Sequence, residues 1–176
     1  GATGPLPPAA FLALSGGGDN GAFAAGLLNG WTAAGNRPQF KLVTGISTGA
    51  LIAPFAFVGG AKHDQALRDF YTGVTSKDVL EARSILAAVT DDAMADNAPL
   101  RRLVGRVMTA ELMQEIAAEH AKGRVLLIGT TNLDARRGVI WNLTKIAASG
   151  HPNSLQLIQD LMVASAAIPG GFPPMM

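Results

Sequence analysis

The chain of 176 residues is long enough for one domain with a substantial core and too short for two comfortable ones. Apolar residues make up 48% of it and charged residues 15%, which is typical of an α/β domain with a buried sheet and excludes a disordered segment. The net charge of +1, without a basic block, argues against a nucleic-acid partner, and the lack of cysteine excludes disulfides, a zinc–thiolate site and a cysteine nucleophile.

Strand and helix signals alternate along the chain after a leader, residues 1–10, that we expect to be flexible. Apolar runs predict strands at residues 11–15, 40–44, 124–131 and 138–143. Apolar spacings of three and four predict helices at residues 21–34, 48–57, 64–72, 100–107, 110–121 and 154–166. This order predicts one α/β domain over residues 11–176, with a mostly parallel sheet and helices on both faces. The less regular residues 76–97 are interpreted as a surface excursion.

A glycine cluster joins the first expected strand to the first expected helix. Gly16, Gly18 and Gly21 have the spacing G-x-G-x-x-G, and Gly17 lies between the first two. A strand, a glycine loop and a helix start present free backbone N–H groups, so this segment predicts an anion site. The anion is either a dinucleotide pyrophosphate or the oxyanion of an acyl transfer. A dinucleotide site requires an acidic residue about twenty positions later, and residues 39–43 contain none, so the oxyanion is favoured.

The second motif is G-x-S-x-G, formed by Gly45, Ser47 and Gly49. It follows an apolar run and opens a helix-compatible segment, which is the setting of a nucleophile elbow. The flanking glycines allow the sharp turn that exposes the serine Oγ at the carboxyl edge of the sheet. The same glycines make residues 42–61 a strand, turn and helix rather than a membrane span.

A base for Ser47 is not evident from the sequence. His63 and His120 are expected to be solvated on helices, and His151 lies in a loop without a context that recommends it. Asp134 follows a strand, where a turn carboxylate is the favoured interpretation, and Asp19 is expected to brace the glycine loop. The residues alone therefore predict a nucleophile and an oxyanion site without an assigned base.

From about residue 11 to residue 176 the chain resembles the patatin-like phospholipase family. Three blocks carry the resemblance, residues 16–23, 45–50 and 164–174, which read GGGDNGAF, GISTGA and ASAAIPGGFPP. The resemblance implies a three-layer α/β/α fold and hydrolysis of lipid acyl esters by a Ser–Asp dyad without histidine. It implies that Ser47 is the nucleophile and that the backbone amides of Gly16, Gly17 and Gly18 form the oxyanion hole. Many relatives carry Arg or Lys where this chain has Asn20, so charge stabilisation from this side chain is not expected.

The catalytic aspartate of the family lies in an Asp-Gly-Gly or Asp-Gly-Ala motif after the proline-rich block, and residues 1–176 contain no such motif. We therefore expect either a piece of a longer protein, an aspartate supplied by another polypeptide, or an inactive chain. The alternative functions are a non-catalytic lipid-binding or regulatory domain and, less favoured, a dinucleotide-binding module. No cofactor or metal is implied.

The resemblance implies a lipid or ester substrate and peripheral membrane contact. An open edge of a parallel sheet predicts self-association, or pairing with a C-terminal remainder. The sequence indicates a soluble domain and does not indicate its compartment.

Overall fold

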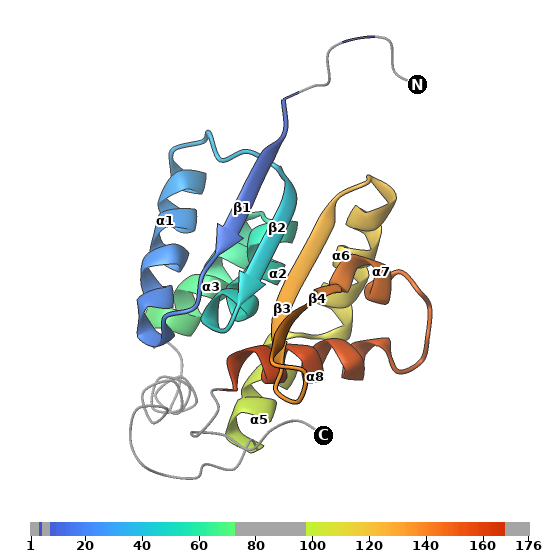
Figure 1. Ribbon diagram of the computed structural model, residues 1–176. Helices are drawn as coiled ribbons and strands as arrows, with labels where there is room; N and C mark the ends of the chain where they lie inside the picture. Colours follow the sequence, from blue (N-terminus) through green and yellow to red (C-terminus); the bar gives the residue numbers. More distant parts are fainter. Residues whose placement is uncertain (1–3, 5–7, 73–97, 168–176) are drawn as a thin grey trace.

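The computed structural model describes residue 4 and residues 8–72 and 98–167, which form one sheet with helices packed against it (Figure 1). The sheet has the strand order β1–β2–β3–β4. The strands are Ala10–Leu14 (β1), Phe40–Ile46 (β2), Val125–Asn132 (β3) and Arg137–Asn142 (β4). The first three are parallel, and β4 returns antiparallel to β3 as a hairpin. The predicted α/β class with a mostly parallel sheet is confirmed, and the arrangement agrees with the three-layer fold that the resemblance implies.

The helices follow the predicted order. They are Gly21–Ala33 (α1), Thr48–Val58 (α2), Ala61–Thr72 (α3), Ala98–Val107 (α5), Ala110–Ala121 (α6), Leu143–Ala147 (α7) and Ser154–Ala166 (α8). A short 3₁₀ turn, Gly18–Asn20 (η1), precedes α1. Figure 1 shows β1, β2 and β3 each leading toward the same end of the sheet, where the loops before α1 and α2 lie. This carboxyl edge is where open α/β sheets bind ligands.

Most predicted element bounds differ little from those in the structure. The largest difference is at α3, which begins at Ala61 rather than at residue 64, and α7 was not predicted. Helix α7 is too short to show a 3.6-residue period, and its start depends on Asn142, whose Oδ1 accepts a hydrogen bond from the Lys145 amide at 2.9 Å. The expected excursion at residues 76–97 lies outside the described residues. So does most of the expected leader, and Ala10 already belongs to β1.

Helix α2 is the centre of the core. All of its residues except Val58 are buried, and it contacts β1, β2 and β3 as well as α1, α3, α6 and α8. A helix that is apolar on all sides is expected in such a central position. The strand residues that face it, among them Val43, Leu126 and Ile128, are fully buried. This packing fixes the N-terminus of α2 against the end of β2.

The opposite face of the sheet carries exposed apolar side chains. Gly45 faces α2, because a Cβ there would lie 2.9 Å from the Cβ of Ala53, so its neighbour Ile46 faces away. Ile46 is 46% exposed and Ile140 68% exposed, and both lie beside Gly129. Within residues 8–72 and 98–167, this part of the outer face is therefore open. The expected self-association stays a prediction.

Candidate active site

Ser47 lies in the single-residue turn between β2 and α2, at the carboxyl edge of the sheet. Its backbone angles are φ 55° and ψ −127°, in a region that side-chain-bearing residues rarely adopt. Such a conformation costs about 1–3 kcal/mol and persists only where the surrounding structure imposes it. The side chain is half-buried. The turn therefore holds a strained, partly accessible serine at the start of a buried helix.

Glycine on both sides of Ser47 permits this turn. A Cβ on Gly45 would lie 2.7 Å from the carbonyl carbon of Gly49, and a Cβ on Gly49 would lie 2.7 Å from the carbonyl carbon of Leu14. Both obstacles are backbone atoms, which cannot move aside as a flexible side chain can. Glycine is needed at these two positions for close approach of the chain, although neither has a positive φ.

The glycine loop after β1 lies against Ser47. A Cβ on Gly16 would lie 2.9 Å from the Ser47 Cβ and 3.4 Å from its Oγ. Gly17 and Gly18 have φ values of 147° and 54°, which direct the loop into η1. Thr48 fixes the loop from the other side, because its Oγ1 donates a hydrogen bond to the Gly18 carbonyl at 3.1 Å. The structure thus brings the two predicted motifs together.

The glycine loop that lies against Ser47 has backbone donors that are unpaired among the described residues. Within the described part of the chain, no group accepts a hydrogen bond from the amide N–H of Gly17 or Gly18. Ser47 is also the N-cap residue of α2, so the positive end of the helix macrodipole lies at this serine. Free N–H groups and a helix N-terminus next to a serine are suited to stabilise negative charge on a carbonyl oxygen.

Gly21 completes the glycine motif and has a packing role. A Cβ at this position would collide with Thr48 Cγ2 and the Tyr71 hydroxyl. Because Gly21 has no Cβ, the first turn of α1 can approach the first turn of α2 and the end of α3. Gly21 therefore brings the loop and the Ser47 turn together, and a Cβ there would meet Thr48 and Tyr71 rather than Ser47.

The Ser47 amide is held by a residue that the sequence did not suggest for the site. Its N–H donates a hydrogen bond to the Oγ of Ser165, near the end of α8, at 2.9 Å. Ser165 belongs to the third block of the resemblance, which is the only signal in the sequence that points to it.

The expected solvent exposure of His63 is wrong. His63 is buried, and its Nε2 contacts the carboxylate of Glu115 on α6, which Lys62 also contacts at 3.3 Å. His120 is half-buried, also against expectation, and its Nδ1 is enclosed. Asp134 is exposed in the turn between β3 and β4. None of these groups is hydrogen-bonded to Ser47.

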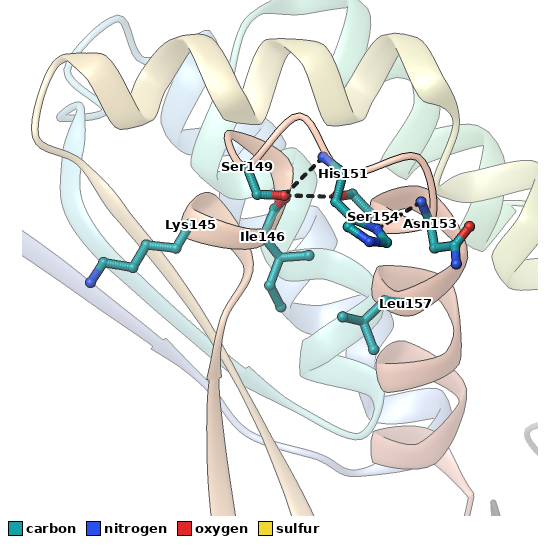
Figure 2. Close-up of a pocket in the computed structure, with 7 residues that line it drawn as sticks. All are labelled: Lys145, Ile146, Ser149, His151, Asn153, Ser154 and Leu157. Atoms are coloured by element: carbon teal, nitrogen blue, oxygen red, sulfur yellow. Dashed lines mark hydrogen bonds between the residues drawn. The ribbon is translucent and has the colours of Figure 1, made fainter.

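His151 belongs to a separate cavity of about 430 Å³ in the segment that joins α7 to α8 (Figure 2). The cavity is lined by Lys145, Ile146, Ser149, His151, Asn153, Ser154 and Leu157. The Oγ atoms of Ser149 and Ser154 are 2.9 Å apart, and the Nδ1 of His151 accepts a hydrogen bond from the Asn153 amide at 3.1 Å. His151 therefore stabilises its own loop, and Ser47 does not line this cavity.

The described residues contain neither a metal-binding cluster nor a membrane-spanning helix. No group of three or more His, Cys, Asp or Glu side chains there is arranged to hold a metal ion. No helix in residues 8–72 and 98–167 is long and apolar enough to cross a membrane.

The fold and the site define an α/β protein in which a glycine loop and a serine turn meet at one edge of a mostly parallel sheet. The sequence profile of patatin-like phospholipases matches residues 12–175, and the chain belongs to this family. A comparison with curated proteins gave no match. Family membership supports a lipid acyl hydrolase as the class of protein.

Proposed function

We propose that this chain is a serine acyl hydrolase domain for carboxylic esters of lipids, with Ser47 as the nucleophile. The observation that carries the proposal is the strained Ser47 turn with the glycine loop against it. Membership of the patatin-like phospholipase family supports the same chemistry. The finer assignments are Gly45, Ser47 and Gly49 as the nucleophile elbow and the amides of Gly16, Gly17 and Gly18 as donors to the oxyanion.

In the proposed reaction the Oγ of Ser47 attacks the ester carbonyl carbon. The new C–O bond forms while the hydroxyl proton passes to a carboxylate base. The carbonyl π electrons move onto the oxygen, and the amide N–H groups donate hydrogen bonds to the resulting oxyanion. Collapse of this intermediate breaks the bond to the alcohol, which leaves with the proton. Water then gives a proton to the same base and attacks the acyl-serine. Collapse of the second intermediate breaks the bond between the acyl carbon and Oγ, the base returns the proton to Oγ, and the carboxylic acid and free Ser47 are released.

The base in this proposal is the aspartate of the family's Ser–Asp dyad. None of the aspartates in residues 1–176 stands in an Asp-Gly-Gly or Asp-Gly-Ala context, so the base is not assigned to a residue of this sequence. Removing one member of a catalytic unit typically costs about 10⁴- to 10⁶-fold in kcat. The oxyanion donors alone are worth about 10²- to 10³-fold. Turnover is therefore expected to depend on the presence of an aspartate-bearing segment.

Hydrolysis of p-nitrophenyl butyrate, measured together with the intact mass of the protein, tests the proposal. We expect turnover that is lost in Ser47→Ala, in a preparation whose mass spectrum also contains the segment with the aspartate. A preparation that contains this segment and shows no Ser47-dependent turnover would contradict the proposal. In that case a binding titration with a non-hydrolysable lipid analogue distinguishes the remaining alternative, a lipid-binding or regulatory domain.

A further inference from the structure

The hydroxyl of Ser165 connects three elements at the edge of the sheet. It accepts the hydrogen bond from the Ser47 amide at 2.9 Å and donates one to the carbonyl of Gly129 at 2.7 Å. Ser165 lies in the last turn of α8, Ser47 follows β2, and Gly129 is in β3. One side chain thus satisfies a backbone donor and a backbone acceptor that belong to different strands.

The chain needs such a bridge at this point because the ladder between β2 and β3 ends there. Ile46 and Gly129 are the last paired residues of the two parallel strands. The N–H of Ser47, the next residue, has no backbone acceptor among the described residues and donates to the Ser165 Oγ instead. A half-buried amide without a partner is unfavourable, and a side-chain acceptor removes this cost.

A serine or threonine hydroxyl suits this bridge because it can donate and accept at the same time. Alanine could do neither, and a carboxylate could only accept. The support is rigid, since Leu161, Met162, Val163 and Ala166 around Ser165 are buried in the core. The position of the hydroxyl is therefore set by the packing of α8.

From this geometry we infer that Ser165 is a positioning residue for the nucleophile. By holding the Ser47 amide, it fixes the φ angle of 55° and hence the direction of the Cα–Cβ bond that carries Oγ. Because the Ser47 N–H already donates to Ser165, it is not available to the oxyanion, whose donors would come from the glycine loop. The inference rests on the proposed role of Ser47 as the nucleophile.

The test compares Ser165→Ala with Ser165→Thr, which keeps the hydroxyl. Ser154→Ala is the matched control, because Ser154 is on the same helix and its buried hydroxyl pairs with Ser149 rather than with the site. Two readouts are needed for each full-length variant. The first is hydrogen exchange of the Ser47 amide by NMR, which requires no turnover. The second is kcat and KM for p-nitrophenyl butyrate in the preparation that contains the aspartate-bearing segment.

We expect Ser165→Ala to accelerate exchange of the Ser47 amide by about tenfold and to lower kcat by about tenfold with little change in KM, as for the loss of one hydrogen bond. Ser165→Thr should restore both values, and Ser154→Ala should alter neither. The inference is overturned if Ser165→Ala leaves exchange at Ser47 unchanged. It is also overturned if exchange rises while kcat stays at the wild-type value. If the wild-type protein shows no turnover even in the preparation that contains the aspartate-bearing segment, the proposed function fails, and the exchange readout alone decides whether Ser165 holds Ser47.

Discussion

Ser47 has backbone angles that glycine adopts without strain and other residues adopt rarely, so a comparison with glycine measures the strain of the turn. Replacement by alanine removes the hydroxyl and keeps the strain, whereas replacement by glycine removes both. The strain is worth about 1–3 kcal/mol, and the greater freedom of glycine in the unfolded chain offsets about 0.5–1 kcal/mol of the gain. We therefore expect Ser47→Gly to be about 1 kcal/mol more stable than Ser47→Ala in urea unfolding. If Ser47→Gly is no more stable than Ser47→Ala, the strain does not exceed the roughly 0.5–1 kcal/mol that the freedom of glycine offsets, which would contradict the larger strain expected here.

A glycine-to-alanine substitution can be compared at a crowded position, Gly49, and at an open one, Gly26. A methyl group on Gly49 would lie 2.7 Å from the backbone of both Leu14 and Ser15, whereas one on Gly26, on the exposed side of α1, would meet nothing within 4 Å. We expect Gly49→Ala to lower the free energy of unfolding by about 3 kcal/mol, since β1 or α2 must shift. Gly26→Ala should raise it by about 0.5–1 kcal/mol, because alanine is the better helix former. Urea titration of both variants measures the difference, and a stable Gly49→Ala protein would rule out the close approach of α2 to β1.

Among the elements, Arg124, directly before β3, connects three segments that are distant in sequence. Its buried guanidinium donates hydrogen bonds to Glu119 at 2.7 Å, to the Phe40 carbonyl at 2.8 Å and to the Phe57 carbonyl. It also lies 4.4 Å from the centre of the Phe57 ring, a cation–π contact. Arg124 thereby joins the start of β2, the end of α2 and the end of α6.

Removing the charge of Glu119 should weaken this junction more than removing an exposed charge. Glu119→Gln leaves the buried guanidinium without a counter-ion, and breaking a buried pair in this way typically costs about 3–5 kcal/mol. Glu111→Gln is the control, because Glu111 and its partner Lys62 are both mostly exposed. We expect a large fall in the denaturant midpoint for Glu119→Gln and none for Glu111→Gln. Similar midpoints for the two variants would contradict a structural role for the Arg124 junction.

The sequence predicted the elements other than α7 well because each of them has a local signal. Apolar runs mark β2 and β3, and glycines mark both turns at the site. The contacts that hold the site together have no such signal. Ser165 lies 118 positions from Ser47, and Glu115 lies 52 positions from His63, so both pairs depend on how helices pack. The burial of His63 was not predicted for this reason, since the polar residues next to it in sequence do not reveal that α6 packs against it.

At the scale of the whole molecule, two glutamates make stability depend on pH. Burial raises the pKa of Glu115, but hydrogen bonds and charges from His63 and Lys62 outweigh it and leave the pKa below its ordinary value of 4.5. Burial likewise raises the pKa of Glu119, and the contacts with Lys122 and Arg124 again lower it overall. Because both pKa values are lower in the folded state, the unfolded chain binds more protons. The stabilisation is present above pH 4.5 and is lost as the pH falls through the folded-state values.

Urea unfolding at a series of pH values between about 7 and 3 tests this dependence. We expect the free energy of unfolding to decrease once the pH is lowered below 4.5, the ordinary glutamate pKa. In Glu115→Gln this decrease should be shallower than in the wild-type protein. An equal slope in the variant would mean that Glu115 titrates alike in the folded and unfolded chain.

The most direct test of the central claim is the site of covalent labelling by a fluorophosphonate probe. Trypsin releases residues 42–62 as one peptide, in which Ser47 is the sole serine. The account predicts a single adduct in the intact mass, located on this peptide and absent from Ser47→Ala. An adduct that persists in Ser47→Ala, or no adduct in a preparation that contains the aspartate-bearing segment, would contradict the assignment of Ser47 as the nucleophile.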